Sequence, residues 1–321
     1  NARMPLHTTS TPVNDQQPFK PSTFGPWLKQ VRMQPIAATG FALTLMGILF
    51  LLGHSVVQIA FGLPPPGLGL ALLGGLAAFV TTALGALPAI ILRKLPQRME
   101  DVMLGLAAGM MLAATAFSLI VPALNASGAL VSHKGLASGV VVFGMSLGVL
   151  LMLGMDALLP HEHMVIGAVG PGHERISRIW LFVFAIAVHN LPEGMAIGAS
   201  FAQADLRVGL PLTTAIAIQD IPEGLAVAVA LKSAGFSPKK SVWIAVATGL
   251  LEPLGALLGV GLSSGLAMAY PIGLSLAAGA MLFVVSHEVI PETHRNGHQT
   301  AATLGLMAGF SIMMVLDTAL G

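Results

Sequence analysis

Two nearly identical polar phrases lie 30 residues apart in this otherwise apolar chain. The first runs from His189 to Gly194 and reads HNLPEG, and the second runs from Gln219 to Gly224 and reads QDIPEG. Imidazole nitrogen and carboxylate oxygen are the atoms that bind Zn²⁺ and other first-row divalent ions in proteins. The types of residue in the two phrases therefore indicate a cation site.

The spacing within each phrase places its polar residues on one face of a helix. His189 and Glu193 are separated by four positions, as are Gln219 and Glu223, and Asp220 precedes Glu223 by three. Residues at these separations are neighbours on a helix surface. We expect the two helices to be consecutive and antiparallel, so that the phrases meet near the middle of a membrane in inverted topology, as in many transporters.

Four carboxylates lie deep in apolar segments, and no Lys or Arg lies there with them: Glu193, Asp220, Glu223 and Glu252. A charge at the centre of a bilayer costs about 2.5–3.5 kcal/mol on insertion scales. The counter-charge must be a proton, a histidine or a metal cation, which indicates a cation pathway. The alternative for a single buried acid is a protonated side chain in a hydrogen bond, and for Glu252 a protonated acid beside the kink at Pro253.

Four carboxylates would balance two divalent ions, so we predict a binuclear centre with Glu193 and Glu223 as bridging ligands. Met111 lies at similar depth, and its thioether suits a soft ion such as Cd²⁺. Because the chain has 17 methionines, core packing is the simpler interpretation of Met111 on composition alone.

Further polar residues lie at the ends of the segments and could form an exit or an entrance for the ion. We name as candidates His287, Glu288, Asp156, His161, His163, Asp317 and Ser118. Asp317 lies toward the outside. Ordinary loop polarity explains the group around His161 equally well.

Composition identifies the class of fold that must position these residues. Hydrophobic residues make up 55% of the 321 positions and charged residues 9%, whereas a soluble domain carries about 25% charged residues. We therefore predict an all-α polytopic membrane protein. The net charge of +1 argues against a nucleic-acid partner. The absence of cysteine excludes disulfides and thiolate ligands.

Nine apolar runs are long enough to cross a bilayer, for which about 20 residues are needed. They cover 36–62, 67–92, 102–124, 136–160, 179–203, 208–231, 241–268, 271–293 and 300–320. We predict a disordered cytosolic tail over 1–34, an accessory transmembrane helix over 35–62, and an eight-helix domain with an inverted repeat over 67–321. Leu63–Pro66 and Tyr270–Pro271 are read as tight turns between spans.

The distribution of basic residues predicts the orientation. With the N-terminal tail in the cytosol, and Arg3 left aside as a residue that a cloning tag could supply, the outside holds two basic residues, Lys134 and Arg207. The inside holds Lys20, Lys29, Arg32, Arg93, Lys94, Arg98, Arg175, Arg178, Lys232, Lys239, Lys240 and Arg295. This positive-inside bias places the N-terminus in the cytosol and the C-terminus outside. We expect a multi-pass protein of the plasma membrane, which in a bacterium is the inner membrane.

The paired phrases, together with Glu252-Pro253 and Ser286–Glu288, resemble the ZIP (Zrt-, Irt-like protein) family of divalent metal transporters. The similarity covers residues 67–320, and the extra first span resembles that of a bacterial member. The resemblance implies uptake of Zn²⁺, and also of Cd²⁺ or Fe²⁺, into the cytosol. It implies metal ligands at Met111, His189, Asn190, Glu193, Gln219, Asp220, Glu223 and Glu252. The loop at 161–175 is short, so loop-based metal sensing is not expected.

The leading hypothesis is thus a zinc importer and not an enzyme, with the lipid bilayer and divalent ions as its partners and a homodimer as a candidate assembly. One alternative is a carrier of protons or monovalent cations, although a Na⁺ site would not favour His189. The other is an intramembrane metallohydrolase. The zincin motif H-E-x-x-H is absent, and the sequence His161–His163 has the wrong spacing for it.

Overall fold

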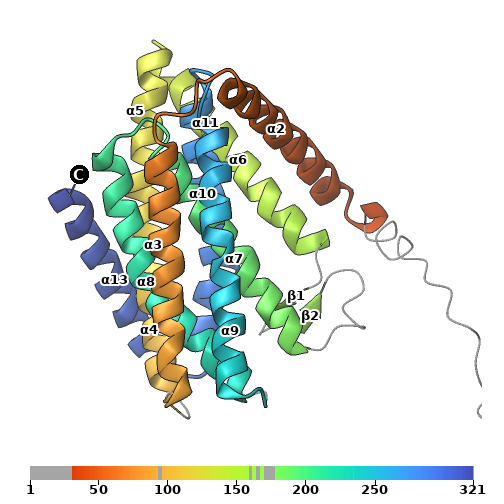
Figure 1. The fold of residues 1–321 in the computed structure, drawn as a ribbon, viewed down its shortest axis with the longest axis vertical. Helices are drawn as coiled ribbons and strands as arrows, with labels where there is room; N and C mark the ends of the chain where they lie inside the picture. The colour runs from red at the N-terminus through yellow and green to blue at the C-terminus, as the bar shows by residue number, and fades with distance from the viewer. Residues whose placement is uncertain are drawn as a thin grey trace, which may run out of the picture.

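The computed structural model describes residues 31–92, 96–158, 161–163, 167–169, 178–233 and 235–320 (Figure 1). The predicted cytosolic tail lies outside these residues up to position 30. Within these residues the regular secondary structure is helical apart from one short antiparallel pair, β1 (His161–His163) and β2 (Gly167–Val169). The predicted all-α polytopic class is confirmed.

The helices follow the predicted spans closely. In chain order they are α2 (Pro35–Ala60), α3 (Leu68–Ala86), η1 (Leu87–Ile90), α4 (Gln97–Ala114), η2 (Thr115–Ile120), α5 (Val121–Leu130), α6 (Lys134–Leu158), α7 (Arg178–Ser200), α8 (Leu206–Ser233), α9 (Pro238–Gly249), α10 (Leu251–Leu262), α11 (Ala269–Val284), η4 (Val285–Val289), α12 (Ile290–Thr293) and α13 (Gln299–Leu320). Within the described residues, eight stretches are long and apolar enough to cross a membrane. The remaining predicted span, 179–203, coincides with α7.

Two of the spanning stretches contain a proline that follows a wider helical turn. The π-helical segment η2 precedes Pro122 on α5, and η4 precedes Pro291 on α12. Proline removes a backbone donor and crowds the preceding turn. A π-helical turn replaces the i to i−4 backbone hydrogen bonds with wider ones and makes room for the proline ring. The helix therefore continues past the proline instead of ending. The stretch from Gln97 to Leu130 therefore reaches 34 residues, longer than the predicted 102–124.

One predicted turn is wrong. Tyr270 and Pro271 lie in the first turn of α11, which begins at Ala269, and the chain reverses before them. Gly265 in that reversal has a φ of +88°, a conformation that glycine adopts without steric cost. Proline is well tolerated in the first turn of a helix, because the backbone N–H groups there have no partner within the helix. The Tyr-Pro pair thus marks the start of a helix.

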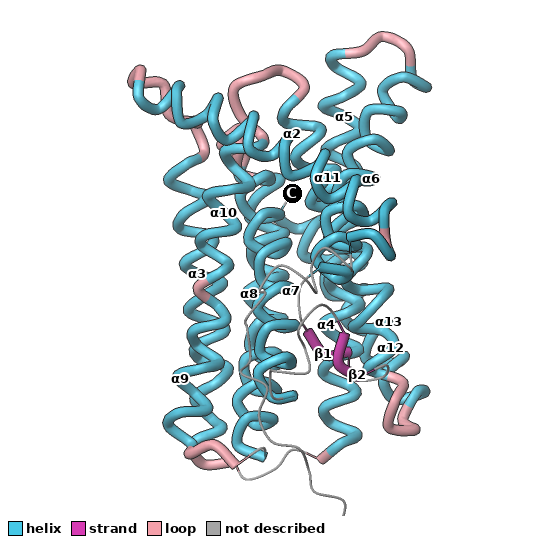
Figure 2. Tube along the Cα trace, turned by 90° about the vertical axis from the view of Figure 1, so that its right-hand side faces the viewer, coloured by secondary structure: helices cyan, strands magenta, loops and turns pink. Residues whose placement is uncertain are grey.

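The helices form two bundles (Figures 1 and 2). We call α3, α7, α8, α9 and α10, with η1, the first bundle, and α4, α5, α6, α11, α12 and α13, with η2 and η4, the second bundle. The most extensive packing joins α3 to α8 and α7 to α10 in the first bundle, and α4 to α13 and α6 to α11 in the second. An inverted repeat would relate α3 to α10, α4 to α11, α6 to α13 and α7 to α8. This relation turns the α3–α8 pair into the α10–α7 pair and the α4–α13 pair into the α11–α6 pair, so the observed packing agrees with an inverted repeat.

The accessory helix α2 lies at the edge of the second bundle. It packs mainly against α6 and more lightly against α10.

Glycine lets the paired helices approach to backbone contact next to the two polar phrases. A Cβ atom added to Gly194 on α7 would overlap the backbone carbonyl of Glu252 on α10. A Cβ atom added to Gly224 on α8 would overlap the carbonyl of Thr82 on α3. Small residues at such crossings are the usual means of close helix packing in membranes. The final glycine of each phrase therefore presses its helix against a different partner in the first bundle.

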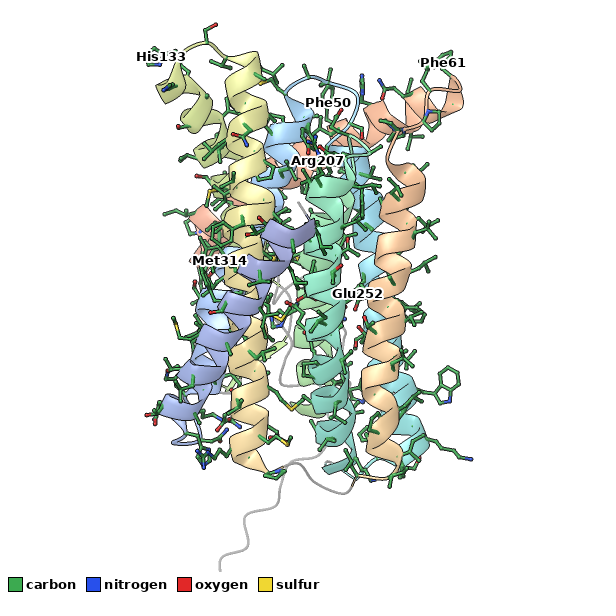
Figure 3. All side chains as sticks on the ribbon, turned by 90° about the vertical axis from the view of Figure 1, so that its left-hand side faces the viewer. Phe50, Phe61, His133, Arg207, Glu252 and Met314 are labelled. Atoms are coloured by element: carbon green, nitrogen blue, oxygen red, sulfur yellow. The ribbon has the colours of Figure 1, made fainter. Side chains whose placement is uncertain are left out.

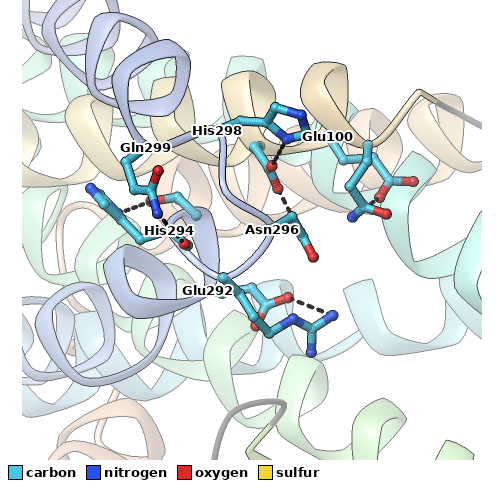
Figure 4. A network of polar contacts seen from close by, with 10 residues as sticks. Glu100, Glu292, His294, Asn296, His298 and Gln299 are labelled. Carbon is cyan, nitrogen blue, oxygen red and sulfur yellow. Dashed lines mark hydrogen bonds and ion pairs between the residues drawn. The ribbon is translucent and has the colours of Figure 1, made fainter.

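A buried carboxylate links two helices at one end of the second bundle (Figure 4). The side chain of Asp101, near the start of α4, is fully buried. It accepts a hydrogen bond of 2.8 Å from the amide of Asn296 and lies 2.8 Å from Nδ1 of His298, both on the connection to α13. Nearby, Arg295 pairs with Glu292 at 3.4 Å. The contact joins the start of α4 to the start of α13.

Candidate metal centre

The two polar phrases and Glu252 come together in the interior of the first bundle. Asn190 and Glu193 on α7, and Asp220 on α8, are each 1% exposed, and Glu252 is fully buried. Glu252 lies in the first turn of α10, just after the short break that separates it from α9. Figure 3 shows it about half-way along the bundle. The predicted meeting of the two phrases at mid-depth is thus what the structure contains.

Three carboxylates lie close enough to share a metal ion. Glu193, Asp220 and Glu223 each offer one oxygen, and these oxygens all lie within 4.8 Å of one another. Two of the residues come from α8 and one from α7, so the group exists only where the two phrases face each other. Carboxylate oxygens at such separations can bind one divalent cation placed between them.

Uncharged donors hold one oxygen of two of the acids. The amide of Gln219 donates to Oε1 of Glu193. The hydroxyl of Thr82 donates to Oε1 of Glu252 at 2.6 Å, and the amide of Asn190 lies 3.5 Å from the same oxygen. Among the described residues, the donors to these carboxylates carry no charge, so the hydrogen bonds orient the acids without neutralising them.

Several other oxygens of the same residues are buried and have no hydrogen-bond partner among the described residues. They are Oε2 of Glu193, Oε1 of Glu223, Oε2 of Glu252 and Oδ1 of Asn190. An unsatisfied buried acceptor costs about 1–3 kcal/mol, and more when it is charged. Oxygen atoms of this kind, buried and without a donor, are the atoms that a bound cation would satisfy. The donor set therefore fits a metal ion, with Asn190 offering its amide oxygen.

Electrostatics point in the same direction. Like charges so close together, in a medium of low dielectric constant, repel strongly. The repulsion disappears only when protons or a metal cation compensate the charges. A centre that is rich in acids, poor in fixed positive charge and supplied with unpartnered oxygens is suited to bind a cation.

Comparison with known proteins supports this interpretation. The sequence profile described as "ZIP Zinc transporter" matches residues 166–317. Zinc transporter ZIPB of Bordetella bronchiseptica is 59% identical over 297 residues, which cover 92% of this chain and 96% of that protein. The chain belongs to the ZIP family. Zinc transporter GufA of Myxococcus xanthus is 42% identical over 258 residues, 79% of this chain and all of the relative. Human zinc transporter ZIP11 is 30% identical over 335 residues, covering 78% and 97% of the two chains.

In this ZIP family member, His189 pairs with an acid outside the two phrases. Its Nε2 atom lies 2.7 Å from Oε2 of Glu288 on η4, a residue of the second bundle. The sequence predicts for Glu288 a place in an exit or entrance for the ion, apart from the ligand set. Because the pair joins the metal centre to the second bundle, the two predicted groups are continuous in space.

The other predicted candidates fall into four places. Met111 is buried on α4, which packs against α8, and its role as a ligand stays a prediction. Asp156 lies 4.0 Å from His287, so these two candidates meet, and Ser118 donates to Asp317 at 2.7 Å. His161 and His163 belong to β1, whose side chains lie outside the described part of the chain.

Sequence reasoning missed Thr82, the residue that holds Glu252. The signal was present as a second repeat: residues 82–87 read TALGAL and residues 252–257 read EPLGAL. The repeat is weak because its most informative position changes from threonine to glutamate. The structure shows that the repeat is relevant to the centre, because the two stretches pack against the two polar phrases.

Proposed function

We propose that this ZIP family member transports divalent metal ions, with Zn²⁺ as the main substrate, through the centre formed by α7, α8 and α10. The single observation that supports it best is the group of Glu193, Asp220 and Glu223, two of them buried and the third half-buried, whose oxygens lie within 4.8 Å of one another. The relatives named zinc transporters supply the identity of the ion. Membership in a family of transporters favours transport over the hydrolase alternative.

The proposed centre holds two ions. Glu193 and Glu223 would bridge them, and Asp220, Glu252, His189 and Asn190 would complete the ligand sets, with Gln219 and Met111 as the remaining candidates. Two divalent charges match four carboxylates, so the loaded centre would be close to neutral. A neutral centre can cross the hydrophobic interior at a far lower cost than a charged one. Because the ion must also leave, we expect moderate affinity.

The proposed direction is from outside to cytosol. It rests on the resemblance to the ZIP family; in the positive-inside orientation, the candidates Asp317 and Ser118 would lie toward the entrance and Asp156, His287 and Glu288 toward the exit. The centre belongs to the first bundle, whereas these flanking residues lie on the second. Movement of the first bundle relative to the second would therefore expose the ion alternately to the two groups.

Three finer predictions go with the proposal and rest on the sequence: transport of Cd²⁺ or Fe²⁺, a location in the bacterial inner membrane, and a homodimer.

The test is uptake of radioactive zinc by proteoliposomes that contain the purified full chain. We expect Glu193→Ala and Asp220→Ala to reduce uptake to the level of empty vesicles, because each removes a ligand that no neighbour replaces. Asp205→Asn is the matched control, because this half-buried acid pairs with the exposed Arg207 at the start of α8, in neither of the two phrases. Uptake near the parental rate in either alanine variant, with correct folding shown by size-exclusion chromatography, would refute the proposal.

A further inference from the structure

Thr82 makes a contact that its ordinary role in a helix does not explain. Its hydroxyl lies 2.6 Å from Oε1 of Glu252 and 3.2 Å from the carbonyl of Ala78, one turn earlier. Threonine in a membrane helix commonly donates to that preceding carbonyl. A hydroxyl has one proton, and here the nearer acceptor is the carboxylate. Thr82 is 2% exposed, so water does not compete for the bond.

The neighbouring Thr81 shows the contrast. Its hydroxyl lies 2.8 Å from the carbonyl of Ala78 and 3.4 Å from Oδ2 of Asp220. The backbone carbonyl is therefore its nearer acceptor, and its contact with the metal centre is secondary. Of two adjacent threonines on α3, only Thr82 directs its proton primarily to a candidate ligand.

The hydrogen bond has a consequence for the geometry of Glu252. Thr82 and Asn190 both approach Oε1, so the two donors orient the carboxylate of Glu252 through this one oxygen. The other oxygen, Oε2, is buried and has no partner among the described residues. Glu193 shows the same division, with Oε1 held by Gln219 and Oε2 without a partner. In both acids, an uncharged donor fixes one oxygen and leaves the second for an ion.

The inverted repeat places Thr82 where the other half of the first bundle places Glu252. A Cβ atom on Gly224 would overlap the carbonyl of Thr82, and one on Gly194 would overlap the carbonyl of Glu252. The two glycines end the two polar phrases, so residues 82 and 252 occupy equivalent positions against them.

The next glycine along each helix extends the equivalence. A Cβ atom on Gly85 would overlap the carbonyl of Ile221, and one on Gly255 would lie close to the carbonyl of Leu191. Ile221 and Leu191 hold the same place in the two phrases. The TALGAL and EPLGAL stretches are therefore equivalent in space as well as in sequence.

We propose that Thr82 is a positioning residue for metal transport: its hydroxyl orients Glu252 so that Oε2 is available to the ion. This inference rests on the proposed function. Thr82 and Glu252 occupy equivalent positions in the two halves of the first bundle, and they contact each other. Glu252 supplies a carboxylate, and Thr82 supplies the uncharged donor that orients it. A neutral donor is suitable here because a lysine or arginine at this position would compete with the ion for the carboxylate. Partners that orient metal ligands commonly affect metal affinity by about 10–100-fold.

The experiment compares Thr82→Val, which keeps the shape and removes the hydroxyl, with Thr82→Ser, which keeps the hydroxyl. Thr248→Val is the matched control, because Thr248 is a buried threonine of the same bundle whose hydroxyl donates to the backbone carbonyl of Ala245. Zinc affinity of the purified full chain is measured by equilibrium dialysis, and uptake kinetics are measured in proteoliposomes.

We expect Thr82→Val to weaken zinc affinity and to raise the KM of uptake by about tenfold, with Thr82→Ser and Thr248→Val within twofold of the parent. In a Glu252→Gln background, Thr82→Val should weaken affinity much less, because the two residues act through one contact. Parental affinity and KM in Thr82→Val would overturn the inference, as would equal losses in the Val and Ser variants or full additivity with Glu252→Gln. If Thr82→Val does not fold, Thr82→Ala takes its place against the same three comparisons. These results leave the proposed function standing, since that fails only if Glu193→Ala or Asp220→Ala transports normally.

Discussion

At the scale of single residues, the centre works by leaving oxygen atoms without partners. Folded proteins normally satisfy buried acceptors, and the exceptions call for an explanation. Among the described residues, four of the eight such side-chain atoms lie together on members of the two phrases or of α10: Glu193, Glu223, Glu252 and Asn190. The hydrogen bonds that do exist come from amides and a hydroxyl, which orient the acids and keep their charge available. Residue chemistry alone thus prepares the site for a cation.

The binuclear hypothesis makes a prediction about Glu223. If Glu193 and Glu223 bridge two ions, then Glu223→Gln weakens both sites, because a bridging carboxylate serves both ions. We expect the parent to bind two Zn²⁺ per chain and the variant to bind less than one at the same free zinc concentration, measured by elemental analysis after equilibrium dialysis. Glu292→Gln, which alters an acid paired with Arg295, should retain two ions. A variant that still binds one ion at parental affinity would show that Glu223 does not bridge.

At the scale of elements, the sequence predicted the membrane spans and the helices on which the two phrases lie, because both depend on local patterns of hydrophobicity and residue type. It did not predict the π-turns η2 and η4 or the break between α9 and α10, since these depend on how each helix packs around its prolines. The partner of Glu252 was also missed. Thr82 is 170 residues away in the chain, and its role follows from the pairing of α3 with α8 and α10.

Asp101 carries a prediction of this kind, since it joins two elements of the second bundle. Asp101→Ala removes the acceptor of Asn296 and the partner of His298, which should destabilise the fold by about 1–3 kcal/mol. We expect a lower midpoint of thermal unfolding in detergent, with zinc affinity of the purified chain unchanged because the carboxylates of the centre lie on the first bundle. Glu100→Gln is the control, as its hydrogen bond to Gln97 is exposed. An unchanged midpoint for Asp101→Ala would show that this contact does not hold α4 to α13.

At the scale of the whole molecule, the glycine contacts divide as the bundles do. A Cβ on Gly198 of α7 would overlap the backbone of α10, and one on Gly109 of α4 would overlap that of α13, in each case within one bundle. Contacts between bundles, such as α7 with α11 and α4 with α8, are less extensive. Interlocked backbones resist sliding, whereas a looser interface permits it. This division favours two rigid bodies that move relative to each other.

Burial of the centre turns that division into a prediction about transport. Glu193 and Asp220 are 1% exposed and Glu252 is fully buried, so an ion cannot reach or leave them without a rearrangement. A carrier that rearranges once per cycle returns faster when its site is loaded on the far side, because the loaded centre is closer to neutral. We therefore expect proteoliposomes preloaded with unlabelled zinc to take up radioactive zinc faster than empty ones, with saturation as external zinc rises. The same preloading should have no effect in Glu193→Ala vesicles. Uptake that is unsaturable and slowed by internal zinc would instead indicate a continuous pore through a static bundle, and the two-body interpretation would then be wrong.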